Sequence, residues 1–359
     1  MKSGAGYVYR GESGPVSARK RGRLSVLFLV CLILAVFATG QVVAAPLFDT
    51  DSVLDVTLTG PIGSLFKNKE DRTELPFELQ ADGFTHNIKV RLRGHSRLEI
   101  CAFPPLRLNF RKNPGMQTVF DGQDKLKLVT HCRNYDRGEQ DLLEEFMAYR
   151  IFNVISDKSY RVRLLQINYE DSDEKLDEKA SPRYGFLIEP GSQLAARIGA
   201  NQVELQGVPK QRYDREHAAL VFVFQYLIAN TDWGYVKAFD ENACCHNGNL
   251  FEIDRQILFV PYDFDLAGLI NAQYAFPDSS LHINKVTQRL YRGLCMDREF
   301  LKVALQRINT RRSEILLVAQ NVPGISEKNI EKVTKFLNGF FKQAEREEEL
   351  LRSFEKRCH

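Results

Sequence analysis

The chain has 359 residues, of which 44% are hydrophobic and 26% are charged, and its formal net charge is +3. This composition supports a sizeable apolar core and excludes an intrinsically disordered protein. Six basic residues and one acidic residue lie in the first 44 positions, so the charge of the remainder is +3 less +5, or −2. A nearly neutral chain gives no support to nucleic-acid binding, which needs a clustered basic face.

The N-terminus has the layout of a secretory signal. Basic residues 19–23 precede an apolar run at Leu24–Ala38, and small residues follow up to Ala44. Cleavage is predicted after Ala44, because Pro46 would obstruct a cut directly before it. The chain is therefore expected to be exported, to a periplasm or to the outside. An uncleaved membrane anchor is the alternative, although the run is short for a span of about 20 residues.

Six cysteines remain once residues 1–44 are removed: Cys101, Cys132, Cys244, Cys245, Cys295 and Cys358. In an oxidising compartment an even number of cysteines favours disulfides. Adjacent cysteines rarely bridge each other, so Cys244 and Cys245 are each expected to reach a distant partner. Cys101 and Cys132 are candidates to bridge each other or to meet that pair. Buried free thiols are the alternative.

The segment from Asp51 to Thr130 is expected to be mainly β structure. "LPFELQADGFTHNIKVRLRG" alternates with period two around an Asp82-Gly83 turn, which predicts a hairpin, and "LRLNF" and "KLKLV" predict two further strands. From Glu139 the apolar residues recur every three to four positions, which predicts a helix.

Further along, strands are predicted in "YRVRLLQINYE" and "RYGFLIEP", a long apolar helix in "YDREHAALVFVFQYLIAN", and a hairpin from "NLFEID" and "QILFVPYDF". The remainder is expected to be mostly helical, ending in an amphipathic tail. The fold class predicted is α+β.

Carboxylates follow the apolar helix and the second hairpin. Asp232 stands in "IANTDWGY", and Asp263 and Asp265 stand in "PYDFDLAG". At alternate positions of an extended segment, Asp263 and Asp265 would share one face and repel unless a cation neutralises them. Mg²⁺ is a suitable cation, because it prefers oxygen ligands. The alternatives are exposed acids or a salt bridge to a nearby arginine.

The segment "CCHNGN" lies between these carboxylates and contains His246 and Asn247. A zinc site is disfavoured because the two cysteines are adjacent and lack the spacing of zinc ligands. The amide oxygen of Asn247 joining an aspartate on Mg²⁺ is the simpler assignment.

A strand lysine, Lys127, precedes the helix that carries Glu144 and Glu145. Lysine, helix glutamate, aspartate, asparagine and aspartate follow in the order of the parts of protein-kinase-like phosphotransferases, in which a β-rich lobe precedes a helical one. The local signatures G-x-G-x-x-G, H-R-D and D-F-G are missing.

The chain resembles the CotH-like (spore coat protein H-type) atypical kinases. The resemblance rests on "RLRGHSR", "PPLRLNF", "KLKLVTH", "RYGFLIEP", "NTDWGY" and "PYDFDLAG", in that order, over residues 85–270. It implies a kinase-like two-lobed fold, with a β-rich N-terminal lobe at 47–190 that contains one helix and a mainly helical C-terminal lobe at 191–359. It also implies an exported kinase that uses ATP and Mg²⁺ or Mn²⁺ to phosphorylate Ser or Thr of an exported protein.

Carried over residue by residue, the resemblance makes Asp232 the catalytic aspartate and places Asp263, Asp265 and Asn247 on the metal. The residues implied to contact or position the nucleotide are Lys127, Glu145, Glu189, Arg93 and Ser96. A departure is the position five residues after Asp232, where Lys237 stands in place of an asparagine. Two other functions stay open: an inactive kinase-like binding module of the cell envelope, and a metal-dependent phosphodiesterase that uses Asp263, Asp265 and His246.

Overall fold

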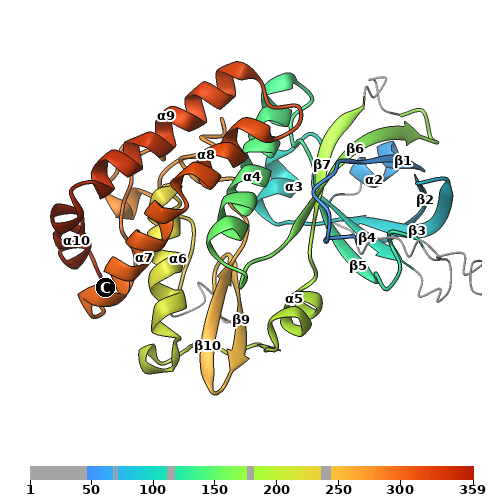
Figure 1. The fold of residues 1–359 in the computed structure, drawn as a ribbon. Helices are drawn as coiled ribbons and strands as arrows, with labels where there is room; N and C mark the ends of the chain where they lie inside the picture. The colour runs from blue at the N-terminus through green and yellow to red at the C-terminus, as the bar shows by residue number, and fades with distance from the viewer. Residues whose placement is uncertain (1–46, 68, 70–71, 111–117, 176–181, 236–243) are drawn as a thin grey trace, which may run out of the picture. The chain divides into compact units, whose positions relative to one another are not determined.

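The computed structural model describes residues 47–67, 69, 72–110, 118–175, 182–235 and 244–359. Residues 44–359 form one compact unit, a mixed α/β fold, as expected (Figure 1). The predicted signal, residues 1–44, lies outside the described residues, as does Lys237. No helix in the described ranges is long and apolar enough to cross a membrane. The predicted division into lobes at residue 190 stays a prediction.

The first sheet is a closed barrel of seven strands. They are β1 (Leu54–Gly60), β2 (Leu75–Ala81), β3 (Phe84–Leu92), β4 (Leu106–Phe110), β5 (Lys125–Val129), β6 (Val162–Asp171) and β7 (Arg183–Ile188). Their order is β1-β2-β3-β4-β5-β7-β6, and parallel pairing of β1 with β6 closes the ring. Sequence analysis predicted these strands but not the closure, because β1 and β6 are about a hundred residues apart and periodicity says nothing about such pairing.

The alternation of side chains explains the barrel core. Ile88, Val90 and Leu92 are buried, while the lysine and arginine between them point outward, as predicted. The β2–β3 hairpin turns at Asp82 and Gly83, and both residues have a positive φ. A two-residue hairpin turn needs this conformation to follow the right-handed twist of the strands.

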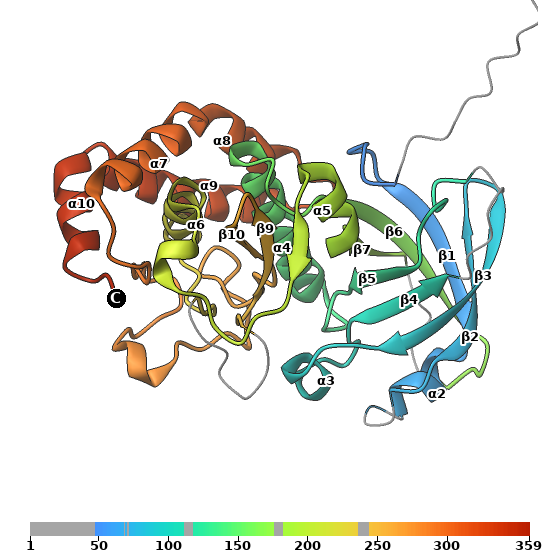
Figure 2. The same cartoon turned by 90° about the horizontal axis from the view of Figure 1, so that it is seen from below.

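A second core lies under the helices. The described helices are α2 (Ile62–Lys67), α3 (Ser96–Ile100), α4 (Asp136–Ile155), α5 (Gly191–Ile198), α6 (Arg215–Leu227), α7 (Arg298–Thr310), α8 (Arg312–Asn321), α9 (Glu327–Ala344) and α10 (Glu347–Glu355). Helix α4 contacts barrel strands β6 and β7 on one side and α8 on the other (Figure 2). It therefore joins the barrel to the helices.

A three-stranded sheet of β8 (Asn201–Val203), β9 (Gly248–Ile253) and β10 (Gln256–Pro261) packs with α6. The β9–β10 hairpin confirms the prediction. The expectation of a mostly helical remainder is wrong for residues 262–297, where the one helical turn is a 3₁₀ turn at Ser279–Leu281. This stretch has no sustained apolar repeat to bury along one helix face.

The six cysteines form three pairs: Cys101–Cys132, Cys295–Cys358 and Cys244–Cys245. The first is one of the pairings considered from the sequence. The expectation that Cys244 and Cys245 each reach a distant partner is wrong. A backbone hydrogen bond from Cys244 to Leu205 holds this segment beside β8, and the other four cysteines pair elsewhere.

Candidate functional site

An arginine from a short helix lies at the centre of the site. Arg97 belongs to α3, which begins at Ser96 directly after the loop that follows β3. The disulfide from Cys101 to Cys132 ties the end of α3 to the chain just after β5. The Arg97 side chain is 8% exposed, so its guanidinium is held inside the protein.

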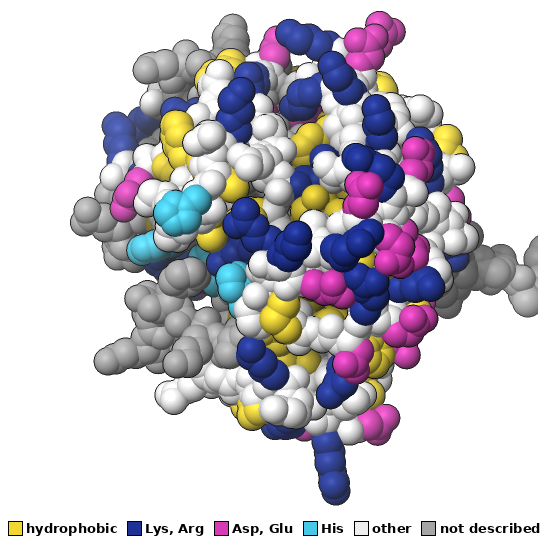
Figure 3. All heavy atoms as spheres, turned by 90° about the vertical axis from the view of Figure 1, so that its left-hand side faces the viewer, with side chains coloured by type: hydrophobic (Ala, Val, Ile, Leu, Met, Phe, Trp, Pro, Cys, Tyr) yellow, Lys and Arg dark blue, Asp and Glu magenta, His cyan; other side chains and the backbone are white. Residues whose placement is uncertain are grey.

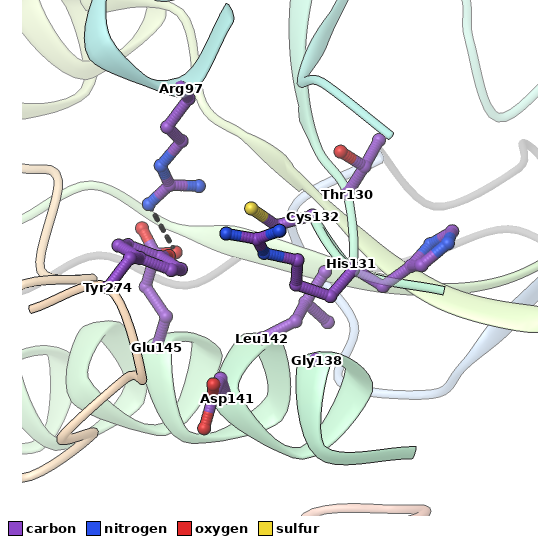
Figure 4. Close-up of a pocket in the computed structure, with 10 residues that line it drawn as sticks. Arg97, Thr130, His131, Cys132, Gly138, Asp141, Leu142, Glu145 and Tyr274 are labelled. Carbon is purple, nitrogen blue, oxygen red and sulfur yellow. Dashed lines mark hydrogen bonds and ion pairs between the residues drawn. The ribbon is translucent and has the colours of Figure 1, made fainter. Parts of the chain in front are cut away.

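Three carboxylates surround the Arg97 guanidinium. Nη2 donates to Glu145 Oε2 at 2.8 Å and to Asp263 Oδ1 at 3.2 Å, and Nε donates to Asp265 Oδ2 at 2.9 Å. Figure 4 shows Arg97 pointing from α3 onto Glu145 of α4, with Tyr274 beside them. The kinase-like resemblance implies that Lys127 and Glu145 both contact or position the nucleotide, and in the structure Glu145 binds Arg97.

Asp263 and Asp265 lie on a turn after strand β10 and not within an extended strand, and this turn places both carboxylates beside Arg97. Strand β10 ends at Pro261, and Asp263 has a φ of +64°, in the left-handed region. Its amide donates to the Tyr149 hydroxyl at 2.9 Å. Phe264 between the aspartates is fully buried against the Tyr149 ring. Anchoring this apolar residue turns both carboxylates toward the same guanidinium.

Burial raises the pKa of Glu145 and of Asp265 above their ordinary values, and the neighbouring carboxylates act in the same direction. The Arg97 charge opposes this effect in both residues, and it is the group that stabilises their ionised forms. A single cation thus supports three clustered acids, which is costly without hydrogen bonds as well as charge.

Two further cations line the site. Lys127 of β5 lies 4.6 Å from the centre of the Tyr262 ring. Burial and then the charge of Arg93 lower the pKa of Lys127 to about 8. Burial also lowers the pKa of Arg93, while attraction to Asp263 opposes the shift. Among the described residues, no carboxylate accepts a hydrogen bond from either side chain, although the charge of Asp263 opposes the lowering of both pKa values.

Asp232 is held on a rigid loop after α6. Its amide donates to Asn230 Oδ1 at 2.9 Å, and the Trp233 indole donates to the Asn230 carbonyl at 3.1 Å. The Asp232 side chain is 34% exposed, so a substrate group can reach it.

Asn247 and His246 both bind the Asp232 carboxylate. Asn247 Nδ2 donates to Asp232 Oδ2 at 2.8 Å, and His246 Nε2 lies 2.9 Å from Oδ1. Asn247, which the sequence predicts as a metal ligand, therefore contacts Asp232 through its amide nitrogen. The hydrogen bond to Asp232 raises the pKa of His246, and the charge of Asp263 adds to the shift.

The Asp232 group and the Arg97 group belong to one site. The Asp263 charge acts on His246, and the Asp232 charge acts on Asp265, so the carboxylates lie within electrostatic range of one another. Asp263 and Asp232, with side chains 36% and 34% exposed, are the accessible members. Arg292 donates to the Thr231 and Trp233 carbonyls and so holds the loop that carries Asp232.

Two other predicted residues form no hydrogen bond or ion pair with this cluster in the described part of the chain. Glu189 at the end of β7 accepts hydrogen bonds from Arg197 at 2.8 and 3.0 Å and from the Arg161 amide at 3.0 Å, so its side chain holds α5 against β6. Ser96 is exposed at the first residue of α3.

The predicted metal ligands are engaged with protein groups. Arg97 occupies one oxygen of Asp263 and one of Asp265, and the Asn247 amide nitrogen is turned toward Asp232. In the described part of the chain, no cluster of three or more His, Cys, Asp or Glu side chains is arranged to hold a metal ion. The oxygen ligands suit Mg²⁺ chemically, but their arrangement does not fit it. The same holds for the hydrolase alternative, in which His246 would have to join Asp263 and Asp265.

On the face shown in Figure 3, Lys and Arg side chains are intermixed with Asp and Glu. That face therefore lacks the single-sign basic patch that a nucleic acid requires.

Comparison with known proteins gives a distant structural likeness. No protein-family model and no curated protein matches the chain. Among solved structures, it is similar to the Helicobacter pylori proinflammatory kinase CtkA, with 13% sequence identity, a TM-score of 0.36, and coverage of 79% of this chain and 90% of that one. A likeness this distant does not assign a function, and the CotH-like resemblance stays a prediction.

Arg97 is the site residue that sequence reasoning did not name, although a salt bridge from Asp263 or Asp265 to a nearby arginine was considered. It lies within "RLRGHSR", beside Arg93 and Ser96. The sequence contained one indication of such a residue: two acids follow an apolar strand, and their charges need a nearby cation. Which arginine supplied it depended on contacts between residues 166 to 168 positions apart.

Proposed function

We propose that the protein is a phosphotransferase that moves the γ-phosphoryl group of ATP to a Ser or Thr hydroxyl of an exported protein. The observation that supports this is a pair of partly buried cations, Arg93 and Lys127, in one site with the accessible carboxylate of Asp232; in the described part of the chain neither cation donates a hydrogen bond to a carboxylate. Like charges held together inside a protein are relieved by an anion, and phosphate oxygens supply one.

In this proposal Lys127 and Arg93 bind the phosphate oxygens and balance their charge. Asp232 orients the acceptor hydroxyl and accepts its proton. The bond from the γ-phosphorus to the ADP oxygen breaks as the bond to the acceptor oxygen forms. Such transfer depends mainly on positioning and charge stabilisation, so few residues suffice.

The residues around Asp232 keep its carboxylate in place. Asn247 and His246 each bind one oxygen, which leaves lone pairs on both oxygens for the acceptor. The hydrogen bond to Asp232 raises the pKa of His246, which favours a charged imidazolium beside the carboxylate.

The remaining predicted roles belong to the same proposal. Ser96 would contact phosphate near Arg93, Glu145 would act through Arg97, and Glu189 would position the segment between the proposed lobes. Mg²⁺ or Mn²⁺ on Asp263, Asp265 and Asn247 is expected from the sequence, but no step is assigned to it here, because these side chains are engaged with Arg97 and Asp232. Export of the enzyme and of its acceptor is proposed from residues 1–44.

A kinase-shaped binding module is the second candidate. The observation that favours it is that protein groups already satisfy the carboxylates on both sides of the site: Arg97 on Asp263 and Asp265, and His246 with Asn247 on Asp232. Such a module would recognise an exported protein without transfer.

The test is incubation of the purified protein with γ-labelled ATP and a generic protein acceptor, with Mg²⁺, with Mn²⁺, and with chelator. Asp232→Asn should lower the rate of labelling by about 10²-fold or more. The matched control is Asp254→Asn, which changes an exposed aspartate in the turn between β9 and β10 and should label normally. Absence of labelling in all three conditions, with no thermal shift on adding ATP, would reject the kinase and leave the binding module.

A further inference from the structure

The Arg97 guanidinium joins three separate segments of the chain. It binds Glu145 of α4, and Asp263 and Asp265 after β10, while Arg97 itself comes from α3. The side chains of Arg97, Glu145 and Asp265 are 8%, 3% and 9% exposed. A planar guanidinium with fixed donors suits such a group of carboxylates better than a flexible ammonium would.

The surroundings keep Arg97 in this position. The disulfide Cys101–Cys132 fixes α3 to the chain after β5, and that chain packs closely on α4, where a Cβ at Gly138 would lie 2.6 Å from two backbone oxygens. The cavity beside Arg97, Glu145 and Tyr274 measures about 10 Å³ (Figure 4). That is room for about one water molecule.

Arg97 occupies one oxygen of Asp263 and one of Asp265, so a divalent ion would have to bind their other oxygens next to the guanidinium. Mg²⁺ requires near-octahedral geometry and usually keeps several waters. The guanidinium already neutralises the carboxylates, and its positive charge would repel a divalent ion placed beside them. The arrangement thus disagrees with the magnesium site that the sequence predicts.

We infer that Arg97 is a built-in counter-ion that takes the place of a divalent metal, and that the site binds a nucleoside triphosphate as the free anion on Arg93 and Lys127. The first half stands on the geometry of Arg97 alone. The second half rests on the proposed function. Arg97 is a positioning residue here, because it acts through the carboxylates and touches no substrate.

The first experiment tests the metal and uses no nucleotide. Binding of Mn²⁺ is titrated by electron paramagnetic resonance, and melting temperatures are measured with chelator, Mg²⁺ or Mn²⁺. The wild type should bind no Mn²⁺ at a specific site and show no shift. Arg97→Ala leaves three clustered carboxylates without a cation, so it should bind one Mn²⁺ and melt about 4 °C higher with the ion than without it.

The matched control is Arg289→Ala. Arg289 is also largely buried, and among the described residues it donates to the Leu227 and Phe336 carbonyls and to no carboxylate, so its removal should create no Mn²⁺ site. If Arg97→Ala does not fold, Arg97→Gln keeps hydrogen-bond donors without the charge and replaces it. Specific Mn²⁺ binding by the wild type, lost in Asp263→Asn, overturns the inference, as does a folded Arg97 variant that binds no ion.

The second experiment compares ATP in excess chelator with ATP and Mg²⁺ on the wild type. A rise in melting temperature at least as large in chelator is expected. A rise that appears only with Mg²⁺ overturns the inference while supporting a nucleotide site. No rise in either condition rejects the proposed function and the second half of the inference, and the Mn²⁺ titration then decides the role of Arg97 by itself.

Discussion

Replacing Lys127 with Met should stabilise the protein while removing nucleotide binding. Lys127 is the cation for which burial and the charge of Arg93 lower the pKa from 10.5 to about 8. Its ammonium is therefore held in the folded protein at a cost. Methionine has a similar length and no charge, so it can fill the same space beside Tyr262 without that cost.

The magnitude follows from the pKa. Each tenfold change in acidity is worth about 1.36 kcal/mol, so a pKa of about 8 corresponds to a penalty of about 3 kcal/mol for the charged lysine. Loss of the cation–π contact with the Tyr262 ring offsets about 1 kcal/mol of this. Part of the side chain is solvated, which reduces the penalty further. The expected net gain in the free energy of unfolding is about 1 to 2 kcal/mol near pH 7.

The gain has a defined pH dependence. Below pH 8 the lysine is charged in both the folded and unfolded states, so the full penalty applies to the wild type. Between pH 8 and 10.5 the folded protein releases the proton before the unfolded chain does, so the wild type becomes more stable as pH rises. The advantage of Lys127→Met should therefore be largest at pH 7 and clearly smaller at pH 9.5.

The assay is urea denaturation of wild type and variant at both pH values, with the ATP-induced rise in melting temperature measured in parallel. The matched control is Lys125→Met, two residues away on the same strand and exposed, which should change stability by less than about 0.5 kcal/mol. A Lys127→Met protein that is less stable than the wild type at pH 7 would show that the charged Lys127 side chain does not destabilise the fold. Normal ATP binding by this variant would refute its role in the site.

Two further predictions concern the helices and the C-terminus. Lys332 Nζ lies 2.7 Å from fully buried Glu144, and burial raises the pKa of Glu144 to about 7. Lys332→Met should therefore lower the free energy of unfolding by about 2 kcal/mol or more at pH 8, but by less than about 1 kcal/mol at pH 5, where Glu144 is neutral. Equal losses by urea denaturation at both pH values would contradict this. The disulfide Cys295–Cys358 closes a loop of 63 residues. Replacing both cysteines with serine should lower the free energy of unfolding by about 2 to 4 kcal/mol in thermal unfolding and leave the ATP-induced shift unchanged. A loss under about 1 kcal/mol would show that other contacts already restrict this loop in the unfolded chain.

The strands and helices were largely predictable from the sequence, because each depends on neighbours a few residues away. The alternation at Ile88, Val90 and Leu92 and the Asp82-Gly83 turn defined a hairpin before any tertiary information. The same local logic failed for residues 262–297, where no repeat of apolar residues indicates a structure.

The closure of the barrel and the disulfide partners could not be predicted from such local sequence patterns. Pairing of β1 with β6 joins Leu54 to Leu165, and sequence spacing does not report such distant contacts. For Cys244 and Cys245, the sequence argument considered only the usual avoidance of bonds between neighbours. The position of these two residues beside β8 leaves them with each other.

For the site, the sequence determined that Asp263 and Asp265 require a cation, because two carboxylates at the end of an apolar strand repel each other and resist burial. The sequence also identified Asp232 and Asn247 as candidate site residues, and in the structure these two residues form a hydrogen bond. Only the tertiary structure showed that Arg97 lies against both carboxylates. The physical reason is that electrostatic pairing depends on distance in space, and the fold brings α3, α4 and the end of β10 together around one guanidinium.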